Sequence, residues 1–303
     1  MVEDVIVRHA IIVSNGLYYA AILFLVSIGL SMIFGVLNFL NLAHAAFLTL
    51  GAFLTTTLIG AFTYDAFGIV GVLALFAIVL VVVPIVISAI GVGLEVTLFR
   101  YMYDMDETFQ LLATFGFLLM IDDVMKFVWG ASPRRAAAPS QVLGSLSVAG
   151  RTYPLYILFV IAVTVIVAVA LYYFFEETKL GKITLALAED EEMVRASGVD
   201  ARTIHFWVFV IGVGTAALGG AMWVPNASVT IGLSIEFVLL AFAVIVIGGL
   251  GSLKGAIAAS LIIGLIRSYG IAFVPAIELA IVFVLMAVVM IIRPTGLYGG
   301  IHS

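Results

Sequence analysis

Long uncharged runs alternate with short polar stretches along this chain. From Ala10 to Tyr64 no residue carries a formal charge at neutral pH, and His44 is the only one that could gain a positive charge. A helix needs about 20 apolar residues to cross the hydrocarbon core of a bilayer. This first run is therefore long enough for two crossings, and the polar residues at Asn38–His44 predict a break between them. No run shows the alternation over about ten residues that is typical of a barrel strand, so we expect helices.

The later runs predict further spans of the same kind. The total is about eight or nine, depending on whether Asn38–His44 and the glycine-rich stretch 248–255 are full turns or re-entrant segments. We expect residues 1–303 to form one all-α domain, a polytopic transmembrane helical bundle with broken or re-entrant helices. The spans predicted after the first pair are Ala66–Leu94, Thr108–Trp129, Tyr153–Phe175, Phe206–Pro225, a span from Phe237 to the sequence GGLGSLKG, Ala256–Tyr269 and Phe273–Ile292.

Three polar stretches connect these spans, at 95–107, 130–151 and 176–205. Basic residues tend to stay on the cytoplasmic side of a membrane. Segment 176–205 has four of them and segment 130–151 has three, which weakly favours a cytoplasmic position for 176–205. The seven residues are Lys179, Lys182, Arg195 and Arg202 in the first segment, and Arg134, Arg135 and Arg151 in the second.

The composition indicates that lipid is the solvent. Hydrophobic residues make up 64% of the 303, and Asp, Glu, Lys and Arg together only 10%, whereas a soluble domain has about 25% charged residues. The N-terminal sequence MVEDVIVRHA has neither the basic region nor the cleavage site of a signal peptide, so the first run is predicted to remain as a span. The chain has 18 acidic and 13 basic residues. This balance fits a salt-loving prokaryotic source, and it also fits chance in a small sample of charges.

The sequence contains no recognisable catalytic or metal-binding motif. There are no cysteines and only 4 histidines, which argues against a zinc site, a thiol nucleophile or a disulfide framework. Gly181–Lys182 is followed by Ile183 and has no glycine-rich lead-in, so the chain lacks the phosphate-binding loop of many ATPases. Hydrolase motifs and basic aromatic patches are also missing. We expect no catalytic residue, metal, cofactor or nucleic-acid partner, and a transport protein is favoured over an enzyme.

The polar segment 176–205 predicts one short amphipathic helix at the membrane surface. Its centre, Lys182–Ala196, has no Gly or Pro, and its apolar residues fall near one face at helical spacing. Gly198 is placed to end this helix, and Glu189–Glu192 are expected to be exposed. Two interpretations stay open: an ordinary solvated loop helix, or a docking helix that fits a groove on a cytosolic partner.

Small residues recur at every fourth position in a later segment. Such side chains let helix backbones approach closely in lipid, so tight packing is the first interpretation. The second places this broken segment beside a solute path, because irregular backbone at membrane depth needs protein or a water-filled cavity around it. The residues are Gly248, Ser252, Ala256, Ser260 and Gly264, with Gly249, Gly251 and Gly255 between them.

Two groups of polar residues interrupt the apolar spans. Asn38, Asn41 and His44 either cap a helix junction or line a solute path. Asp122, Asp123 and Lys126 lie toward one end of a predicted span, where they could pair with one another at the interface or contact an ion or solute. Glu278 presents the same choice near the start of the last span. If these acids bind ions, the alternative function is a stand-alone ion-coupled carrier or channel for small polar solutes.

Four segments together resemble a known family, the permease subunits of branched-chain amino acid ABC importers, in its shorter branch of roughly eight spans. The similarity is carried in order by GLSMIFGVLNFLNLAHAAFLTLGAF (29–53), TKLGKITLALAEDEEMVRASGVD (178–200), VIGGLGSLKGAIAASLIIGL (246–265) and RPTGLYG (293–299). The sequence departs from the family pattern at Ala45, where Gly is usual, at Leu185, where a basic residue is common, at Val194, where a small one is, and at the acidic Asp104, Asp106 and Glu107.

The resemblance implies a multi-pass inner-membrane subunit that works with other chains. Such permeases pair with a second, related permease, with cytosolic ATP-binding subunits and with an extracytoplasmic solute-binding protein. Segment 178–200 would then couple to the ATPase, with Gly181, Glu189, Asp190, Glu192 and Gly198 as candidate residues. Branched-chain amino acids are the family's usual solute, although urea, short amides and other amino acids use close relatives. The candidate pathway residues remain Asn38, Asn41, His44, Gly248, Gly249 and Gly251.

Overall fold

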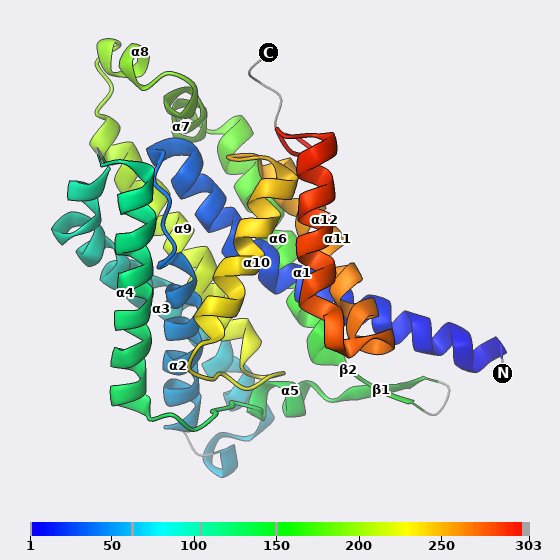
Figure 1. The fold of residues 1–303 in the computed structure, drawn as a ribbon. Helices are drawn as coiled ribbons and strands as arrows, with labels where there is room; N and C mark the ends of the chain where they lie inside the picture. The colour runs from blue at the N-terminus through cyan, green and yellow to red at the C-terminus, as the bar shows by residue number, and fades with distance from the viewer. Residues whose placement is uncertain (1, 62–63, 104, 149–150, 299–303) are drawn as a thin grey trace.

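The computed structural model describes residues 2–61, 64–103, 105–148 and 151–298. Nearly all of the regular structure in these ranges is helical, with one two-stranded hairpin (Figure 1). The long helices are α1 (Val2–Leu37), α2 (His44–Gly60), α3 (Tyr64–Thr97), α4 (Glu107–Trp129), α6 (Leu155–Glu177), α9 (Ala201–Trp223), α10 (Leu233–Gly248), α11 (Leu253–Phe273) and α12 (Glu278–Ile292). The short elements are η1 (Phe99–Met102), α5 (Ala138–Leu143), β1 (Ser145–Val148), β2 (Arg151–Pro154), α7 (Lys179–Glu189), α8 (Glu191–Ala196) and η2 (Pro275–Ile277).

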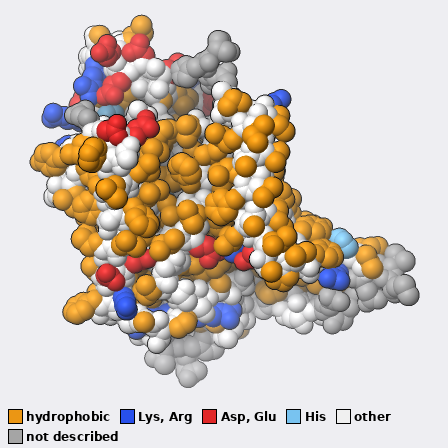
Figure 2. All heavy atoms as spheres, viewed as in Figure 1, with side chains coloured by type: hydrophobic (Ala, Val, Ile, Leu, Met, Phe, Trp, Pro, Cys, Tyr) orange, Lys and Arg blue, Asp and Glu red, His pale blue; other side chains and the backbone are white. Residues whose placement is uncertain are grey.

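Each predicted span coincides with one of the long helices, so the prediction of an all-α bundle is confirmed. Six helical segments in the described ranges are long and apolar enough to cross a membrane, and α2 and α10 are shorter apolar helices. Figure 2 shows apolar side chains covering the middle of one face, with charged side chains gathered toward its two ends. This distribution is the one expected of a protein that lies across a bilayer.

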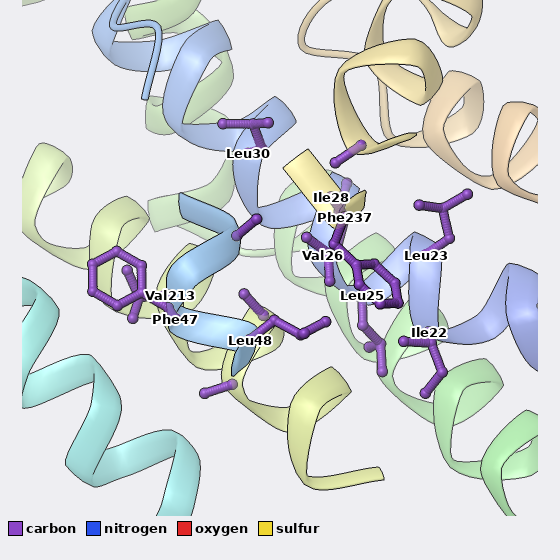
Figure 3. Packing of buried hydrophobic residues seen from close by; sticks show 14 of the residues in the cluster. Ile22, Leu23, Leu25, Val26, Ile28, Leu30, Phe47, Leu48, Val213 and Phe237 are labelled. Atoms are coloured by element: carbon purple, nitrogen blue, oxygen red, sulfur yellow. The ribbon is translucent and has the colours of Figure 1, made fainter. Parts of the chain in front are cut away.

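Helix α1 forms the centre of the bundle. In its most apolar stretch of 18 residues, 89% of the residues are buried. In the corresponding stretch of Pro275–Ile292, which ends with α12, only 6% are buried. Side chains of α1, including Ile22, Leu25 and Ile28, meet Phe47 of α2, Val213 of α9 and Phe237 of α10 in one continuous core (Figure 3). The first apolar run of the sequence is therefore surrounded by protein, and the last one faces outward.

Glycines allow the central helices to approach backbone to backbone. A Cβ atom on Gly212 of α9 would lie 2.9 Å from the carbonyl oxygen of Gly29 of α1, and one on Gly264 of α11 would lie 2.5 Å from that of Gly16. Ala256, Ser260 and Gly264 are all buried. Tight packing, the first interpretation of the small-residue stripe, is confirmed for these residues.

The two ends of the bundle differ in what they display. Helices α7 and α8 lie at one end, near the last described residues, and the β1–β2 hairpin lies at the other (Figure 1). The hairpin is antiparallel, with Leu146 opposite Tyr153. Segment 130–151, which the sequence indicated only as a polar loop, thus contains a short helix and the first strand, and β2 begins at its last residue. An isolated antiparallel β-bridge between the backbones of Arg134 and Val229 fastens this segment to the connection between α9 and α10.

Candidate coupling surface and intramembrane breaks

Helix α7 turns back sharply from the end of α6. The hydroxyl of Thr178 caps α7 by accepting a hydrogen bond from the Gly181 backbone N–H at 3.0 Å. Gly181 is buried, and a Cβ atom on it would overlap the carbonyl oxygen of Phe174. Thr184 and Leu187 bury the inner face of α7. Gly181 is therefore placed to shape the turn, and it presents no side chain to a partner.

The predicted single helix Lys182–Ala196 is wrong, because the structure divides it at Asp190. This residue ends α7 and caps α8, its Oδ1 atom accepting a hydrogen bond from the Met193 backbone N–H at 2.8 Å. Asp favours such N-cap positions because its side chain satisfies an N–H group that the helix leaves free. Gly198 follows α8 with a φ of +82°, so its role in ending the helix is confirmed.

The outer surface of α7 and α8 combines acidic and apolar side chains. Glu189 and Glu192 are exposed, and Met193 is 67% exposed. Glu191 forms an ion pair with Arg195 at 2.6 Å. We call residues 179–196 the coupling surface. Among the candidate residues, Glu189 and Glu192 carry exposed carboxylates, whereas Gly181, Asp190 and Gly198, which follows this surface, determine the backbone path.

The break between α1 and α2 is an extended segment that descends beside α4 before α2 begins (Figure 1). The side chains of α4 satisfy its backbone. Leu40 donates its N–H to Gln110 Oε1 at 3.2 Å, and Leu42 donates to Thr114 Oγ1 at 3.1 Å. Asn38 begins the segment with a φ of +48°, a left-handed conformation that Asn tolerates better than most residues. We call residues 38–43 the first break; it is extended backbone beside α4, and α2 continues from it toward the opposite end of the bundle (Figure 1).

The three polar residues predicted in this region have different environments. Asn38 is exposed, whereas Asn41 and His44 are 1% and 0% exposed. Neither Asn41 nor His44 has a side-chain hydrogen-bond partner among the described residues. The Nε2 atom of His44 lies against Gly29, where a Cβ atom would approach to 2.9 Å. Asn41 lines a small pocket with Phe34, Phe242 and Leu250. The side chains of Asn41 and His44 are thus enclosed within the chain in this conformation.

The break between α10 and α11 is a tight turn made by glycines. Gly248 and Gly255 pack directly against each other, since a Cβ atom on Gly248 would lie 2.5 Å from the carbonyl carbon of Gly255. Gly249 and Gly251 have φ values of +102° and +73°. Residues 293–298, which we call the C-terminal motif, pack on this turn. Leu297 donates its N–H to the Ile247 carbonyl at 2.8 Å, and Tyr298 donates to that of Gly248 at 2.9 Å. We call residues 249–252 the second break.

The fold brings the two breaks together. A Cβ atom on Gly35, at the end of α1, would lie 2.8 Å from the Cα atom of Gly251. Leu250 of the second break lines the same pocket as Asn41 of the first. The pathway candidates therefore lie within or next to the two breaks, and His44, the first residue of α2, directly follows the first break. Both breaks begin at the end of the bundle that carries the coupling surface (Figure 1).

Known proteins that resemble this chain match it over nearly its whole length. The family model for the permease component of the branched-chain amino acid transport system matches residues 12–292. The chain belongs to this family. The permease is 26% identical over 295 residues to the high-affinity branched-chain amino acid transport system permease protein BraD of Pseudomonas aeruginosa, covering 94% of each chain. It is 26% identical over 293 residues to LivH of Salmonella typhimurium, again covering 94% of each.

One solved structure also matches the permease. PsaBC from Streptococcus pneumoniae, in complex with Fab, covers 92% of this chain and 89% of its own, with 14% identity and a TM-score of 0.44. The relatives from Pseudomonas aeruginosa and Salmonella typhimurium do not support the prediction of a salt-loving source.

The acidic residues predicted inside the permease's spans do not pair as a group. Asp122 is buried and accepts a hydrogen bond from the Ser234 hydroxyl at 2.5 Å. Its predicted pairing with Lys126 is not among the ion pairs found between described residues. Asp122 therefore links α4 to the start of α10 and is not arranged with Asp123 and Lys126 as one site.

A second group of charges, of which the sequence analysis singled out only Glu278, ties the opposite end of the permease together. Arg267 of α11 lies 2.6 Å from Glu236 of α10 and 3.7 Å from Glu278 of α12. The guanidinium also lies over the ring of Tyr19 of α1, at 4.2 Å from its centroid. The isolated Arg and Glu in otherwise apolar runs were the available signal, but residues 31 apart in sequence gave no reason to pair them.

Proposed function

We propose that this protein is the membrane-spanning permease subunit of an ATP-driven importer for branched-chain or related amino acids, as a multi-pass protein of the cytoplasmic membrane. The family match over residues 12–292 supports the solute class. The bundle of apolar helices supports the membrane position. The chain has no phosphate-binding loop in its sequence, so the energy comes from partner chains.

The exposed helices of the coupling surface give the proposal its strongest structural support. Helices α7 and α8 project at one end of the bundle, capped by Thr178 and Asp190, with Glu189, Glu192 and Met193 exposed. A short, well-capped pair of helices with an exposed acidic and apolar surface can fit a groove on another protein. We assign this groove to the cytosolic ATP-binding subunits. This orientation places the β1–β2 hairpin on the outer side, toward an extracytoplasmic solute-binding protein.

Transport then proceeds by alternating access. ATP binding and hydrolysis tilt the helices through the coupling surface, and a second, related permease completes the path. Asn38, Asn41, His44, Gly248, Gly249 and Gly251 are the proposed lining on this chain, in line with the rule that irregular backbone and buried polar groups in membranes mark pathways. Since Asn41 and His44 are enclosed here, the two breaks must separate before solute reaches them.

The test is co-expression with the candidate ATP-binding subunits and second permease, followed by ATP-dependent amino acid uptake into proteoliposomes. Reversing both exposed charges, Glu189→Lys with Glu192→Lys, should lower uptake at least about tenfold by opposing charge complementarity at the contact. Glu107→Lys, an exposed acid at the same end outside the coupling surface, is the matched control and should leave uptake unchanged.

The same preparation distinguishes the alternative function. A stand-alone ion-coupled carrier would move solute along an ion gradient when this chain is reconstituted alone. Uptake under those conditions, or uptake unaffected by the double charge reversal, would contradict the proposed role of the ATPase. Insertion into the membrane should be normal in every variant, as checked by protease protection.

A further inference from the structure

The loop between α3 and α4, described at 98–103 and 105–106, is fastened to the first break and also contacts the start of α9, which follows the coupling surface in the chain. On the side of the break, Gln110 accepts the N–H of Leu40 at 3.2 Å while its own amide nitrogen lies 3.2 Å from the Tyr103 carbonyl and 3.1 Å from that of Met105. One buried side chain thus joins the loop to the extended backbone of the break. A continuous path of hydrogen bonds therefore joins this loop to Leu40.

The ring of Tyr103 is the second connection between the loop and the break. It packs edge-on against Phe39, with 5.1 Å between ring centroids and an angle of 65°. Phe39 is fully buried, and its ring also packs against that of Phe99, with 5.7 Å between the ring centroids. Such edge-to-face pairs have a preferred geometry, and a close-packed interior transmits a shift of one member to its neighbour.

On the other side, Tyr103 meets the start of α9 beside the coupling surface. Its ring packs against that of His205, with 6.4 Å between centroids and an angle of 89°. The Tyr103 hydroxyl donates to Glu95 Oε1 at 3.1 Å, and Arg100 donates to both oxygens of the same buried carboxylate, which fixes the ring's position. Burial raises the pKa of Tyr103 above its ordinary value, so the hydroxyl keeps the proton that it donates.

The contact between α8 and α9 is incomplete in this conformation. The Nε2 atom of His205 is buried and has no hydrogen-bond partner among the described residues, yet Glu191 Oε1 of α8 lies only 4.0 Å away. Glu191 is held instead by Arg195. A small movement of α8 toward α9 would bring Glu191 within hydrogen-bond distance of His205, so this pair has a second arrangement close at hand.

We infer that Tyr103 is a positioning residue that transmits movement of α8 to the first break, along the sequence of contacts Glu191, His205, Tyr103 and Phe39. This inference rests on the proposed function, because it requires an ATPase that moves α8. Contacts of this kind carry coupling only where an element has two arrangements that both sites bias. Here that element is the Glu191–His205 pair.

The test uses the reconstituted complex and compares solute taken up per ATP hydrolysed. Tyr103→Leu removes the ring and should lower that ratio by about tenfold, within the range seen for mutations along coupling networks, while ATP hydrolysis and assembly persist. Tyr103→Phe keeps the ring and should retain the ratio within about twofold. Tyr101→Leu is the matched control, because Tyr101 belongs to the same turn and is 71% exposed.

A second readout reports the movement itself and does not depend on transport. The chain has no cysteine, so Asn38→Cys and Met193→Cys can each be introduced alone and labelled with a thiol reagent. ATP should change the labelling rate at both positions in the otherwise unaltered chain. With Tyr103→Leu it should change the rate at position 193 only.

The outcomes separate the inference from the function on which it rests. Unchanged coupling with Tyr103→Leu, or an ATP response at position 38 that survives this substitution, overturns the relay and leaves the importer intact. An absence of any ATP response in the unaltered complex overturns both. A double-mutant cycle between Tyr103→Leu and Glu191→Gln should be strongly non-additive if the two residues act in one route.

Discussion

The two breaks in the helical spans satisfy their backbones in different ways. At the first break, the N–H groups of Leu40 and Leu42 are taken up by side chains of α4. At the second, the carbonyls of Ile247 and Gly248 accept backbone N–H groups from the C-terminal motif. Gly248 and Gly255 also let the backbones of α10 and α11 pack in direct contact. Backbone–backbone packing permits little adjustment, whereas side-chain hydrogen bonds can be exchanged. We expect the second break to be rigid and the first to be the adjustable one.

The largest expected effect lies at the second break. Gly255→Ala would place a Cβ atom against the carbonyl of Gly248, and overpacking of this kind costs about 3 kcal/mol. Thermal unfolding of the purified protein should show a marked loss of stability. The control is Gly116→Ala, a helical glycine with open space around it, which should be neutral or stabilising because Ala favours helix. Equal stability of the two variants would contradict the rigid backbone contact.

The next effect tests the first break. Gln110→Ala leaves the Leu40 N–H and the carbonyls of the 98–106 loop without their partner, and an unsatisfied buried group costs about 2 kcal/mol. We expect a lower unfolding temperature and faster hydrogen exchange around residue 40. Gln141→Ala, at an exposed position, should change the stability by less than about 0.5 kcal/mol. If Gln110→Ala left exchange at residue 40 unaltered, the first break would not depend on α4.

A smaller effect separates backbone strain from close contact at the C-terminal motif. Gly296 has a φ of +81°, and a Cβ atom on it would lie 2.6 Å from the Gly249 nitrogen. Gly144 has a φ of +72° with nothing nearby. Both Gly296→Ala and Gly144→Ala incur the left-handed penalty of about 1 kcal/mol. Only Gly296→Ala should also release the C-terminal motif, which limited proteolysis would detect. Equal proteolysis of the two would argue against the motif holding the turn.

The smallest effect concerns Asn38. Its φ of +48° is left-handed, so Asn38→Ala should cost about 1 kcal/mol and Asn38→Gly should cost little. Chemical denaturation in detergent can measure this difference. A result in which the Gly variant is the less stable would indicate that the Asn38 side chain, and not its backbone, holds the start of the break.

The positions of the helices could be predicted from the sequence because helical hydrogen bonds are local. Runs of apolar residues marked each span, and Gly198 and the glycines at 248–255 marked where the chain must turn. The interruption of the coupling helix at Asp190 was missed, since nothing in Lys182–Ala196 breaks a helix by propensity alone. The division becomes visible only in the structure, where the Asp190 side chain caps α8 by accepting the backbone N–H of Met193.

The candidate site was predictable only as a set of interruptions. The sequence indicated that Asn38, Asn41 and His44 break an apolar run, and family resemblance supplied the partners. It could not show that the first break is extended backbone held by α4 while the second is a tight turn. That difference depends on which residues surround each stretch. Neither the local sequence nor the resemblance to the family specifies those contacts.

The sequence by itself determined that the protein lives in lipid, where its spans lie and which stretches interrupt them, because hydrophobicity and helix periodicity are properties of neighbouring residues. Only the tertiary structure decided how the interruptions are tolerated. The partner of Leu40 lies 70 residues away in Gln110, and that of Glu236 lies 31 residues away in Arg267. A polar group in a membrane must find its partner wherever packing brings one, and packing joins residues that no local pattern connects.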